Sequence, residues 1–195
     1  MIIFFDTETS GLYPGEICQL SYVFQTNTSV YAKNFYFSVS DVEYGAYMVH
    51  GLSVDRLRLL SSGIRFCDKA AEISEDFRSA DLIVGHNVKF DIAFLTAEFN
   101  RCNIDFTPQK TFCSMQKTAK FCKIARKSLQ GYKYPKLSEL CDHYGVRDVD
   151  VRFEAEELFG YANGFHDAKF DVTATYLAVN KAIKAGDLSG LSEYL

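Results

Sequence analysis

Phe5-Asp6-Thr7-Glu8-Thr9-Ser10-Gly11 is the stretch that decides the fold, because it places two acids at the end of an apolar run, Ile2–Phe5. A short apolar run followed by turn residues predicts a buried strand. Side chains two residues apart on a strand point to the same face, so Asp6 and Glu8 would project together. Two such carboxylates repel each other unless a cation neutralises them, and Mg²⁺ or Mn²⁺ prefers carboxylate oxygen. The alternative, which an isolated D-x-E motif favours, is an acidic turn after an edge strand.

A second acid stands at the start of a predicted helix. Leu82-Ile83-Val84-Gly85-His86-Asn87-Val88-Lys89-Phe90-Asp91 predicts a short buried strand, a turn and a helix with Asp91 in its first turn. A carboxylate suits that position, because the N-terminal end of a helix is electropositive. Taken alone, the motif favours the simpler interpretation, in which Asp91 is an ordinary first-turn acid and His86 and Asn87 are turn formers.

A third motif, His166-Asp167-Ala168-Lys169-Phe170-Asp171, opens the last predicted helix. Asp171 would face the sheet and ligate a metal, while His166 lies at the helix entrance. The electropositive helix end disfavours the imidazolium form, so His166 would be neutral and able to accept a proton. The alternative, which this motif alone favours, is a capping histidine beside surface acids.

The remaining patterns predict strands first and an alternation with helices afterwards. Strands are expected at Ile17–Gln25 and Val30–Val39, joined by the turn Thr26-Asn27-Thr28-Ser29. Helices are expected at Asp68–Ser79, Phe90–Asn100, Ser114–Lys127, Lys136–Tyr144 and His166–Ala185. This order predicts an α/β fold in which helices cover a sheet. No repeat or linker interrupts the chain, so residues 1–195 are expected to form a single domain.

The composition is that of a globular protein. The 195 residues are 48% hydrophobic and 24% charged, which excludes a disordered or fibrous chain. The sequence contains no run of about eighteen apolar residues, so no membrane span is predicted. The start, Met1–Phe5, has no basic region before its apolar residues, so no signal peptide is expected and a cytoplasmic location is predicted. None of the 6 cysteines forms a C-x-x-C motif, so all are expected to be reduced thiols, without a structural metal or disulfide.

The three motifs together resemble those of the DEDDh 3′→5′ exonucleases, typified by the proofreading epsilon subunit of bacterial DNA polymerase III. The five motif residues stand in the family's order and are Asp6, Glu8, Asp91, His166 and Asp171. The resemblance covers about residues 1–185. Met48-Val49-His50-Gly51-Leu52-Ser53 is similar to the family's H-G-I-T turn, and Lys136–Cys141 to its helix after the second motif. Cys113-Ser114-Met115 is similar to the Cys-Thr-Met of exonuclease X-like members. Lys169 departs from the pattern, because members often carry an apolar residue there.

The resemblance implies a ribonuclease H-like fold, which is a mixed sheet of antiparallel first strands and then parallel strands, flanked by helices. It implies an exonuclease that releases nucleoside monophosphates from the 3′ end of DNA with two Mg²⁺ or Mn²⁺ ions, in repair or proofreading. Asp6, Glu8 and Asp171 would hold one ion. Asp6 would bridge to the second ion, which Asp91 would help to position, and His166 would be the general base. The partners it suggests are single-stranded DNA 3′ ends and a DNA polymerase.

Substrate contacts are expected on two sides of this site. The resemblance implies that Thr9, Leu12 and His50 hold the terminal nucleotide, with Leu12 wedged against its base. Core packing is the alternative for Leu12. The net charge of −4 hides a segment of about residues 106–138 that has no acid and eight basic residues, so the rest of the chain carries −12. Within it, helical spacing would place four lysines on one face as a rail for phosphates: Lys117, Lys120, Lys123 and Lys127. A solvated face is the alternative for these lysines.

Two other functions remain open from the sequence. An exoribonuclease that trims RNA ends could use the same site, because one or two contacts to the 2′-hydroxyl decide between RNA and DNA. An inactive domain could serve only as a nucleic-acid- or polymerase-binding module. Loss of one of the five motif residues would favour that module, and none is lost.

Overall fold

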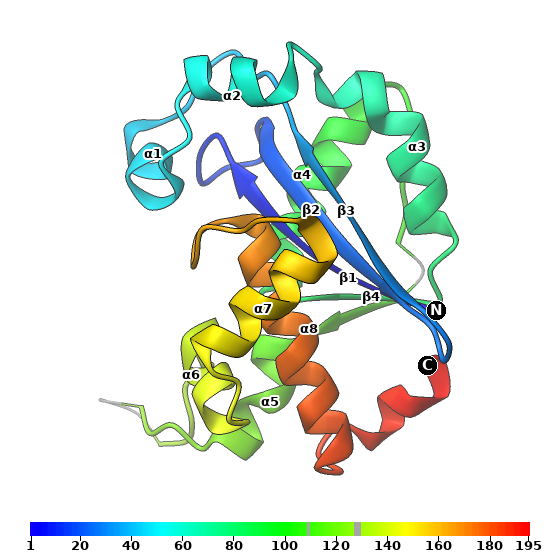
Figure 1. Cartoon of the computed structure of the whole chain (residues 1–195), viewed down its shortest axis with the longest axis vertical. Coiled ribbons are helices and arrows are strands. Elements are labelled where there is room, and N and C mark those ends of the chain that lie inside the picture. The colour runs from blue at the N-terminus through cyan, green and yellow to red at the C-terminus, as the bar shows by residue number, and fades with distance from the viewer. Residues whose placement is uncertain (109, 127–129) are drawn as a thin grey trace.

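The computed structural model describes residues 1–108, 110–126 and 130–195. Its centre is a five-stranded sheet with the strand order β3-β2-β1-β4-β5 (Figure 1). The strands are β1 (Ile2–Thr9), β2 (Ile17–Gln25), β3 (Val30–Tyr36), β4 (Leu82–Gly85) and β5 (Thr111–Cys113). β1, β2 and β3 pair antiparallel, whereas β4 and β5 continue the sheet in parallel from β1. The predicted mixed sheet, antiparallel first and parallel afterwards, is confirmed.

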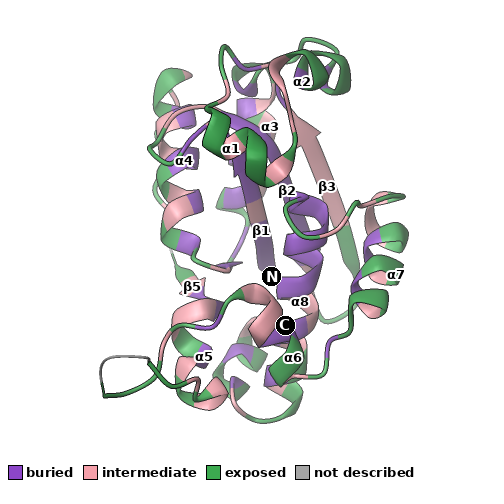
Figure 2. Cartoon of the chain, turned by 90° about the vertical axis from the view of Figure 1, so that its left-hand side faces the viewer, coloured by how far each residue is buried: buried purple, intermediate pink, exposed green. Residues whose placement is uncertain are grey.

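Helices cover both faces of this sheet. The helices are α1 (Tyr44–His50), α2 (Val54–Ser61), α3 (Phe66–Arg78), α4 (Val88–Arg101), α5 (Ser114–Cys122), α6 (Leu137–His143), α7 (Asp148–Phe159), α8 (Ala168–Lys184) and a final 3₁₀ turn, Ser189–Tyr194. α3 and α4 pack on one face, and α8 packs on the other against β1 and β2. β1, β2 and the sheet-facing side of α8 are buried, while the outer surfaces of α1, α6 and α7 are exposed (Figure 2).

The alternation of side chains along β1 divides the core into two layers. Ile3 and Phe5 pack toward α3 and α4. Ile2 and Phe4 pack toward α8. Because the alternation continues to the end of the strand, the two acids of the D-x-E motif share the α8 face. The sheet therefore delivers both carboxylates to the side on which the last helix lies.

α1 lies across the end of β1, where the strand leaves the sheet (Figure 1). The segment before α1 is held there because the Glu43 amide donates to the Ser10 carbonyl, 2.8 Å away. Gly11 lets the Glu43 carboxylate lie against the backbone, since a Cβ at that position would displace the end of this side chain. α1 thereby forms one wall beside the acidic end of the strand.

One prediction about the middle of the chain is wrong. The helix predicted over Ser114–Lys127 is α5, which ends at Cys122, and Lys123 caps it with a left-handed φ of 50°. Two short stretches, 124–126 and 131–133, then pair with each other and form an arm. The Lys133 amide donates to the Ile124 carbonyl at 2.8 Å, and Ala125 bridges to Tyr132. Such cross-strand pairing competes with helical hydrogen bonds, and spacing along the chain could not reveal it.

The expectation of six reduced thiols is also wrong. A disulfide joins Cys67, in the first turn of α3, to Cys102, which caps the end of α4, and their Cα atoms are 5.3 Å apart. The other four cysteines are free, as expected. Short elements that the sequence patterns did not predict are α1, α2, α7, β5 and the final 3₁₀ turn. Among the described residues, no helix is both long and apolar enough to cross a bilayer.

Candidate active site

Three carboxylates meet where β1 ends against α8. Asp6 and Glu8 come from the strand and Asp171 from the first turn of the helix, and one oxygen from each lies within 4.8 Å of the others. Glu8 and Asp171 are buried, and Asp6 is half-buried. The period of the strand and the helix start thus combine as the motifs predict, and the acidic-turn and surface-acid alternatives are excluded for these residues.

Asp91 approaches this cluster from the other face of the sheet. It lies in the first turn of α4 and is buried. Thr7, which alternates with the two acids of β1, donates its hydroxyl to Asp91 Oδ1 at 2.7 Å. Asp91 is outside the compact group of three, yet its charge is among the causes that raise the pKa of Asp6. Asp91, the fourth motif acid, therefore affects the cluster electrostatically from across the end of β1.

Burial and mutual repulsion raise the pKa of each of these acids. Burial is the largest cause of the raised pKa of Asp6 and of Glu8, followed by the charges of neighbouring acids. Burial also raises the pKa of Asp91 and of Asp171 to about 7. For Asp91 the hydrogen bond from the Thr7 hydroxyl opposes that shift. Buried like charges of this kind are stable as anions only beside a compensating cation.

The donor set fits a hard divalent cation. All three clustered ligands offer carboxylate oxygen, which Mg²⁺ and Mn²⁺ prefer. Oδ1 of Asp171 is buried and, among the residues that the structure describes, has no hydrogen-bond partner. A buried acceptor without a donor is unfavourable, and coordination to a cation would satisfy it. These residues are therefore suited to hold Mg²⁺ or Mn²⁺.

His166 lies at the edge of the carboxylate cluster. Its backbone amide donates to Asp171 Oδ2 at 3.0 Å, and its side chain is exposed. With Asp171 it lines a pocket of about 460 Å³. The other residues around this pocket are Lys136, Leu137, Ser138 and Phe165. The histidine thus faces open space beside the acids, where a substrate phosphate has room.

The three residues expected to hold the terminal nucleotide lie together. Thr9 ends β1, and its carbonyl accepts a hydrogen bond at 3.2 Å from His50 Nε2, because the other ring nitrogen, Nδ1, accepts from the Leu52 amide at 3.0 Å. Burial lowers the pKa of His50, and the nearby His166 lowers it further. Both ring nitrogens of His50 make hydrogen bonds within the protein, so a substrate would contact mainly the face of the imidazole ring. Leu12 is 77% exposed, which excludes core packing.

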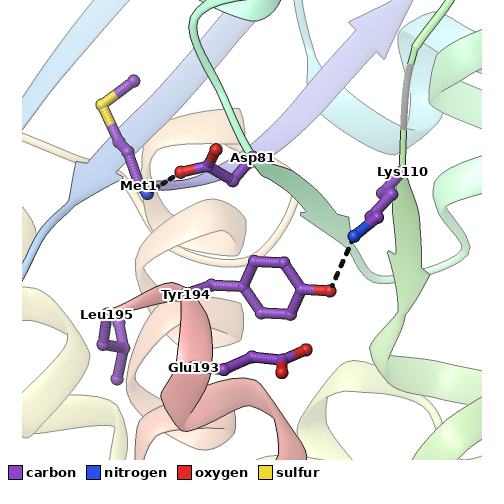
Figure 3. Close-up of a pocket in the computed structure, with 6 residues that line it drawn as sticks. All are labelled: Met1, Asp81, Lys110, Glu193, Tyr194 and Leu195. Carbon is purple, nitrogen blue, oxygen red and sulfur yellow. Dashed lines mark hydrogen bonds and ion pairs between the residues drawn. The ribbon is translucent and has the colours of Figure 1, made fainter.

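Of the four lysines expected to form one rail, the structure describes three, which lie on α5 and at its end. Lys117 and Lys120 lie exposed on α5, and Lys123 lies exposed at the base of the arm. Lys127 lies outside the described residues. Lys110 lies elsewhere, at the end of the sheet where β1 begins, in a polar pocket with Met1, Asp81, Glu193, Tyr194 and Leu195 (Figure 3). That pocket holds none of the motif acids, so it is not part of the active site.

Sequence reasoning passed over the roles of two residues whose side chains have defined partners in the structure. His86, interpreted as a turn former, is a tie between segments, because Ser114 Oγ and the Pro135 carbonyl lie 3.0 and 3.1 Å from its two ring nitrogens. Burial lowers its pKa to about 4, so it is neutral there. Asp167, taken only as part of a motif, is a further buried acid whose charge raises the pKa of Glu8. In the sequence, the only sign of a role for Asp167 was the departure from the family pattern at Lys169.

Comparisons with known proteins agree with this geometry. The family model RNase T, described as "Exonuclease", matches residues 3–177. The DNA polymerase III subunit epsilon of Escherichia coli K12 is 30% identical over 154 residues, which are 74% of this chain and 60% of that protein. The 3′-5′ exonuclease DinG of Staphylococcus haemolyticus is 29% identical over 181 residues, which are 92% of this chain and 18% of that protein. The chain therefore spans less than two thirds of the length of these relatives.

A solved structure shares the fold. S. pombe Pop2p, in a form with Mg²⁺ and Mn²⁺ bound, superposes with a TM-score of 0.58 and 13% identity, covering 94% of this chain and 82% of that one. The similarity at this identity concerns the fold alone. Because the exonuclease family model covers most of the residues, the chain belongs to the RNase T exonuclease family, among its DEDDh, DnaQ-like members.

Proposed function

We propose that this protein is a metal-dependent 3′→5′ exonuclease that releases nucleoside monophosphates from DNA ends. The observation that carries the proposal is the group of three carboxylates within 4.8 Å, with a buried Asp171 oxygen that lacks a partner in the described chain. Such a group is unfavourable by itself and useful with a cation. The similarity to DNA polymerase III epsilon subunits supports DNA as the substrate and a DNA polymerase as a partner.

The residues divide the work of hydrolysis between them. Asp6, Glu8 and Asp171 would hold one divalent ion, and Asp6 with Asp91 would hold a second. When bound, two such ions supply an activated water and stabilise the leaving 3′ oxygen. His166 accepts the proton of the attacking water, because it is the exposed base that borders the cluster.

The substrate strand would be held at both sides of the acids. Leu12 is free to wedge against the terminal base, and Thr9 with His50 forms the wall below it. On the other side, the pocket beside His166 gives the strand room, with Lys136 at its rim. Lys120 and Lys123 would contact phosphates farther along, as would Lys127 outside the described residues. A lysine at each phosphate offsets the repulsion from an acidic protein.

A degradation time course tests this function. Single- and double-stranded DNA and RNA of matched sequence, labelled at the 5′ end, should be incubated with Mg²⁺ or with EDTA. DNA that shortens stepwise from its 3′ end, only with metal, supports the proposal. Asp171→Asn should be inactive, and Asp150→Asn is a matched control, because Asp150 is paired with Arg147 away from the site. RNA shortened in preference to DNA would identify an exoribonuclease, and no cleavage by the intact chain would identify a binding module.

A further inference from the structure

The loop that carries His166 is anchored by a buried ion pair that the proposed chemistry does not use. The loop joins α7 to α8 and ends at Asp167, the N-cap of α8, and Lys169 follows in the first turn of that helix. The two side chains are 4% and 9% exposed, and Lys169 Nζ lies 3.8 Å from the Asp167 carboxylate. Burying two charges is costly unless each also makes hydrogen bonds, so the partners of this pair show what it is for.

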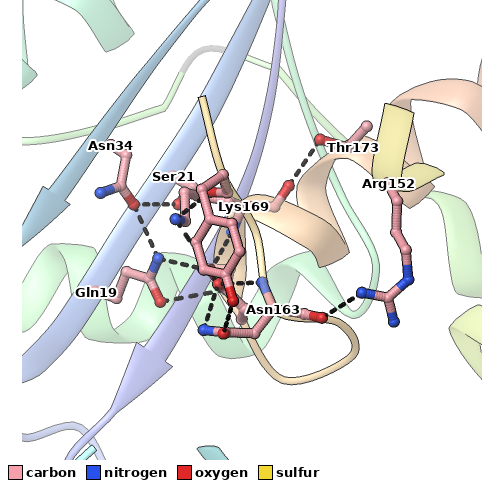
Figure 4. A network of polar contacts seen from close by, with 10 residues as sticks. Gln19, Ser21, Asn34, Arg152, Asn163, Lys169 and Thr173 are labelled. Carbon is pink, nitrogen blue, oxygen red and sulfur yellow. Dashed lines mark hydrogen bonds and ion pairs between the residues drawn. The ribbon is translucent and has the colours of Figure 1, made fainter. Parts of the chain in front are cut away.

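The Asp167 carboxylate connects three parts of the molecule through Gln19, Asn163 and Lys169, which lie close together in Figure 4. Its Oδ2 accepts from the backbone amide and from Nδ2 of Asn163, at 2.9 and 3.1 Å, and Asn163 lies in the loop. Its Oδ1 accepts from Gln19 Nε2 of β2 at 2.9 Å and from the Lys169 amide of α8 at 3.1 Å. Gln19 is itself fixed by a bond of 2.9 Å to Asn34 on β3. One carboxylate therefore joins the loop to the sheet and to the helix.

Two cationic side chains, Lys169 and Arg152, donate hydrogen bonds to carbonyl groups of the same loop. Lys169 Nζ donates to the Tyr161 carbonyl and lies 5.4 Å from the centroid of the Tyr161 ring. Arg152 of α7 donates to the Asn163 carbonyl at 2.6 Å. The Tyr161 hydroxyl is 2.9 Å from Asn163 Oδ1. The loop is thus held by side chains along its length, and most of these bonds reach back to the ion pair.

The placement of His166 depends on this anchoring, together with the packing of the neighbouring Phe165 against Phe170. Its φ of 67° lies in the left-handed region, which is unfavourable for a residue other than glycine. Its amide is bonded to Asp171, but among the described residues no hydrogen bond restrains the exposed imidazole. The backbone of the loop therefore decides where the imidazole stands relative to the carboxylate cluster.

We propose that Asp167 and Lys169 are positioning residues, which set the distance of His166 from the metal-binding acids through Asn163 and Tyr161. This inference rests on the proposed role of His166 as the general base. A displacement of about 1 Å can cost about 100-fold in rate, so loosening the loop would lower kcat and leave metal affinity unchanged. The lysine that departs from the family pattern is, on this view, part of the catalytic architecture of this chain.

Two variants test the proposal without touching a metal ligand. Asn163→Ala removes the side-chain bonds to Asp167 and Tyr161 and leaves every charge in place. Lys169→Met removes the cation. Asn180→Ala is the matched control, since Asn180 lies on α8 and its amide makes a comparable set of bonds to Gln25, away from His166. For each variant, single-turnover rates with excess enzyme and Mg²⁺ or Mn²⁺ affinity by calorimetry would be measured, with a thermal melt to confirm folding.

The same substitutions in a His166→Ala background separate positioning from general weakening. We expect Asn163→Ala and Lys169→Met to lower the rate by about 10- to 100-fold in the wild type and by less than about twofold once His166 is gone. Metal affinity should stay unchanged. Equal losses in both backgrounds, no loss at all, or a matching loss of metal affinity would overturn the proposal. If Lys169→Met does not fold, Asn163→Ala alone decides. If His166→Ala is itself fully active, the general-base assignment fails instead.

Discussion

Replacing Asp91 by asparagine should stabilise the metal-free protein at high pH while it abolishes activity. Burial raises the pKa of Asp91 from 3.8 to about 7, and the Thr7 hydrogen bond only partly opposes this. A carboxyl whose pKa is higher in the folded state stabilises the fold fully below the unfolded pKa, and that stability is lost as the pH rises through the folded pKa. The loss therefore falls between about pH 4 and pH 7.

The size of the effect follows from this shift. Each unit of pKa difference is worth about 1.4 kcal/mol, so Asp91 alone would cost the metal-free protein about 3 kcal/mol between pH 5 and pH 8. That is a large part of a typical stability of about 5–15 kcal/mol. Asparagine keeps an oxygen to accept the Thr7 hydroxyl and carries no charge at any pH. Asp171 shares the same repulsion, so the effects of the two acids would not simply add.

Urea denaturation in EDTA at pH 5 and pH 8 measures this difference. The free energy of unfolding of Asp91→Asn minus that of the wild type should increase by about 3 kcal/mol between these two values. The difference between variant and wild type is used because buried His86, with its pKa lowered to about 4, makes the fold more stable as the pH rises. This opposite trend would mask the slope of the wild type alone. Saturating Mg²⁺ should remove most of the advantage of the variant. A difference that is constant from pH 5 to pH 8 would refute the electrostatic account of the site.

Three further predictions concern the proposed roles. Asp6→Ala should lose metal binding and activity together, whereas His166→Ala should keep metal affinity in calorimetry and slow turnover by about 10²–10⁴; a loss of metal in both would make the histidine a ligand. Changing Lys120 and Lys123 to glutamine should flatten the salt dependence of single-strand binding by up to about 1.4 units, and an unchanged slope would make them a solvated surface. Cys67→Ser should lower the free energy of unfolding by about 3–4 kcal/mol in urea, with kcat unchanged, unless the disulfide contributes nothing to stability.

The sequence predicted the residues that share a face, because periodicity is a local property. The two-residue period of β1 paired Asp6 with Glu8, and the strand-turn-helix pattern placed Asp91 in the first turn of α4. The hairpin between β2 and β3 was equally visible in its turn residues. The order of the motifs then indicated the mixed sheet and the family.

Only the tertiary structure decided how these segments meet. The sequence could not show that Asp91 reaches the cluster from the opposite face of the sheet, or that Cys67 finds Cys102 across α3 and α4. The arm that ends α5 at Cys122 and the bonds from Asp167 to the loop before α8 were equally hidden. Each of these depends on contacts between residues distant in the chain or on side chains competing for the same backbone groups. Spacing carries no record of such contacts, because packing of the whole core selects among them.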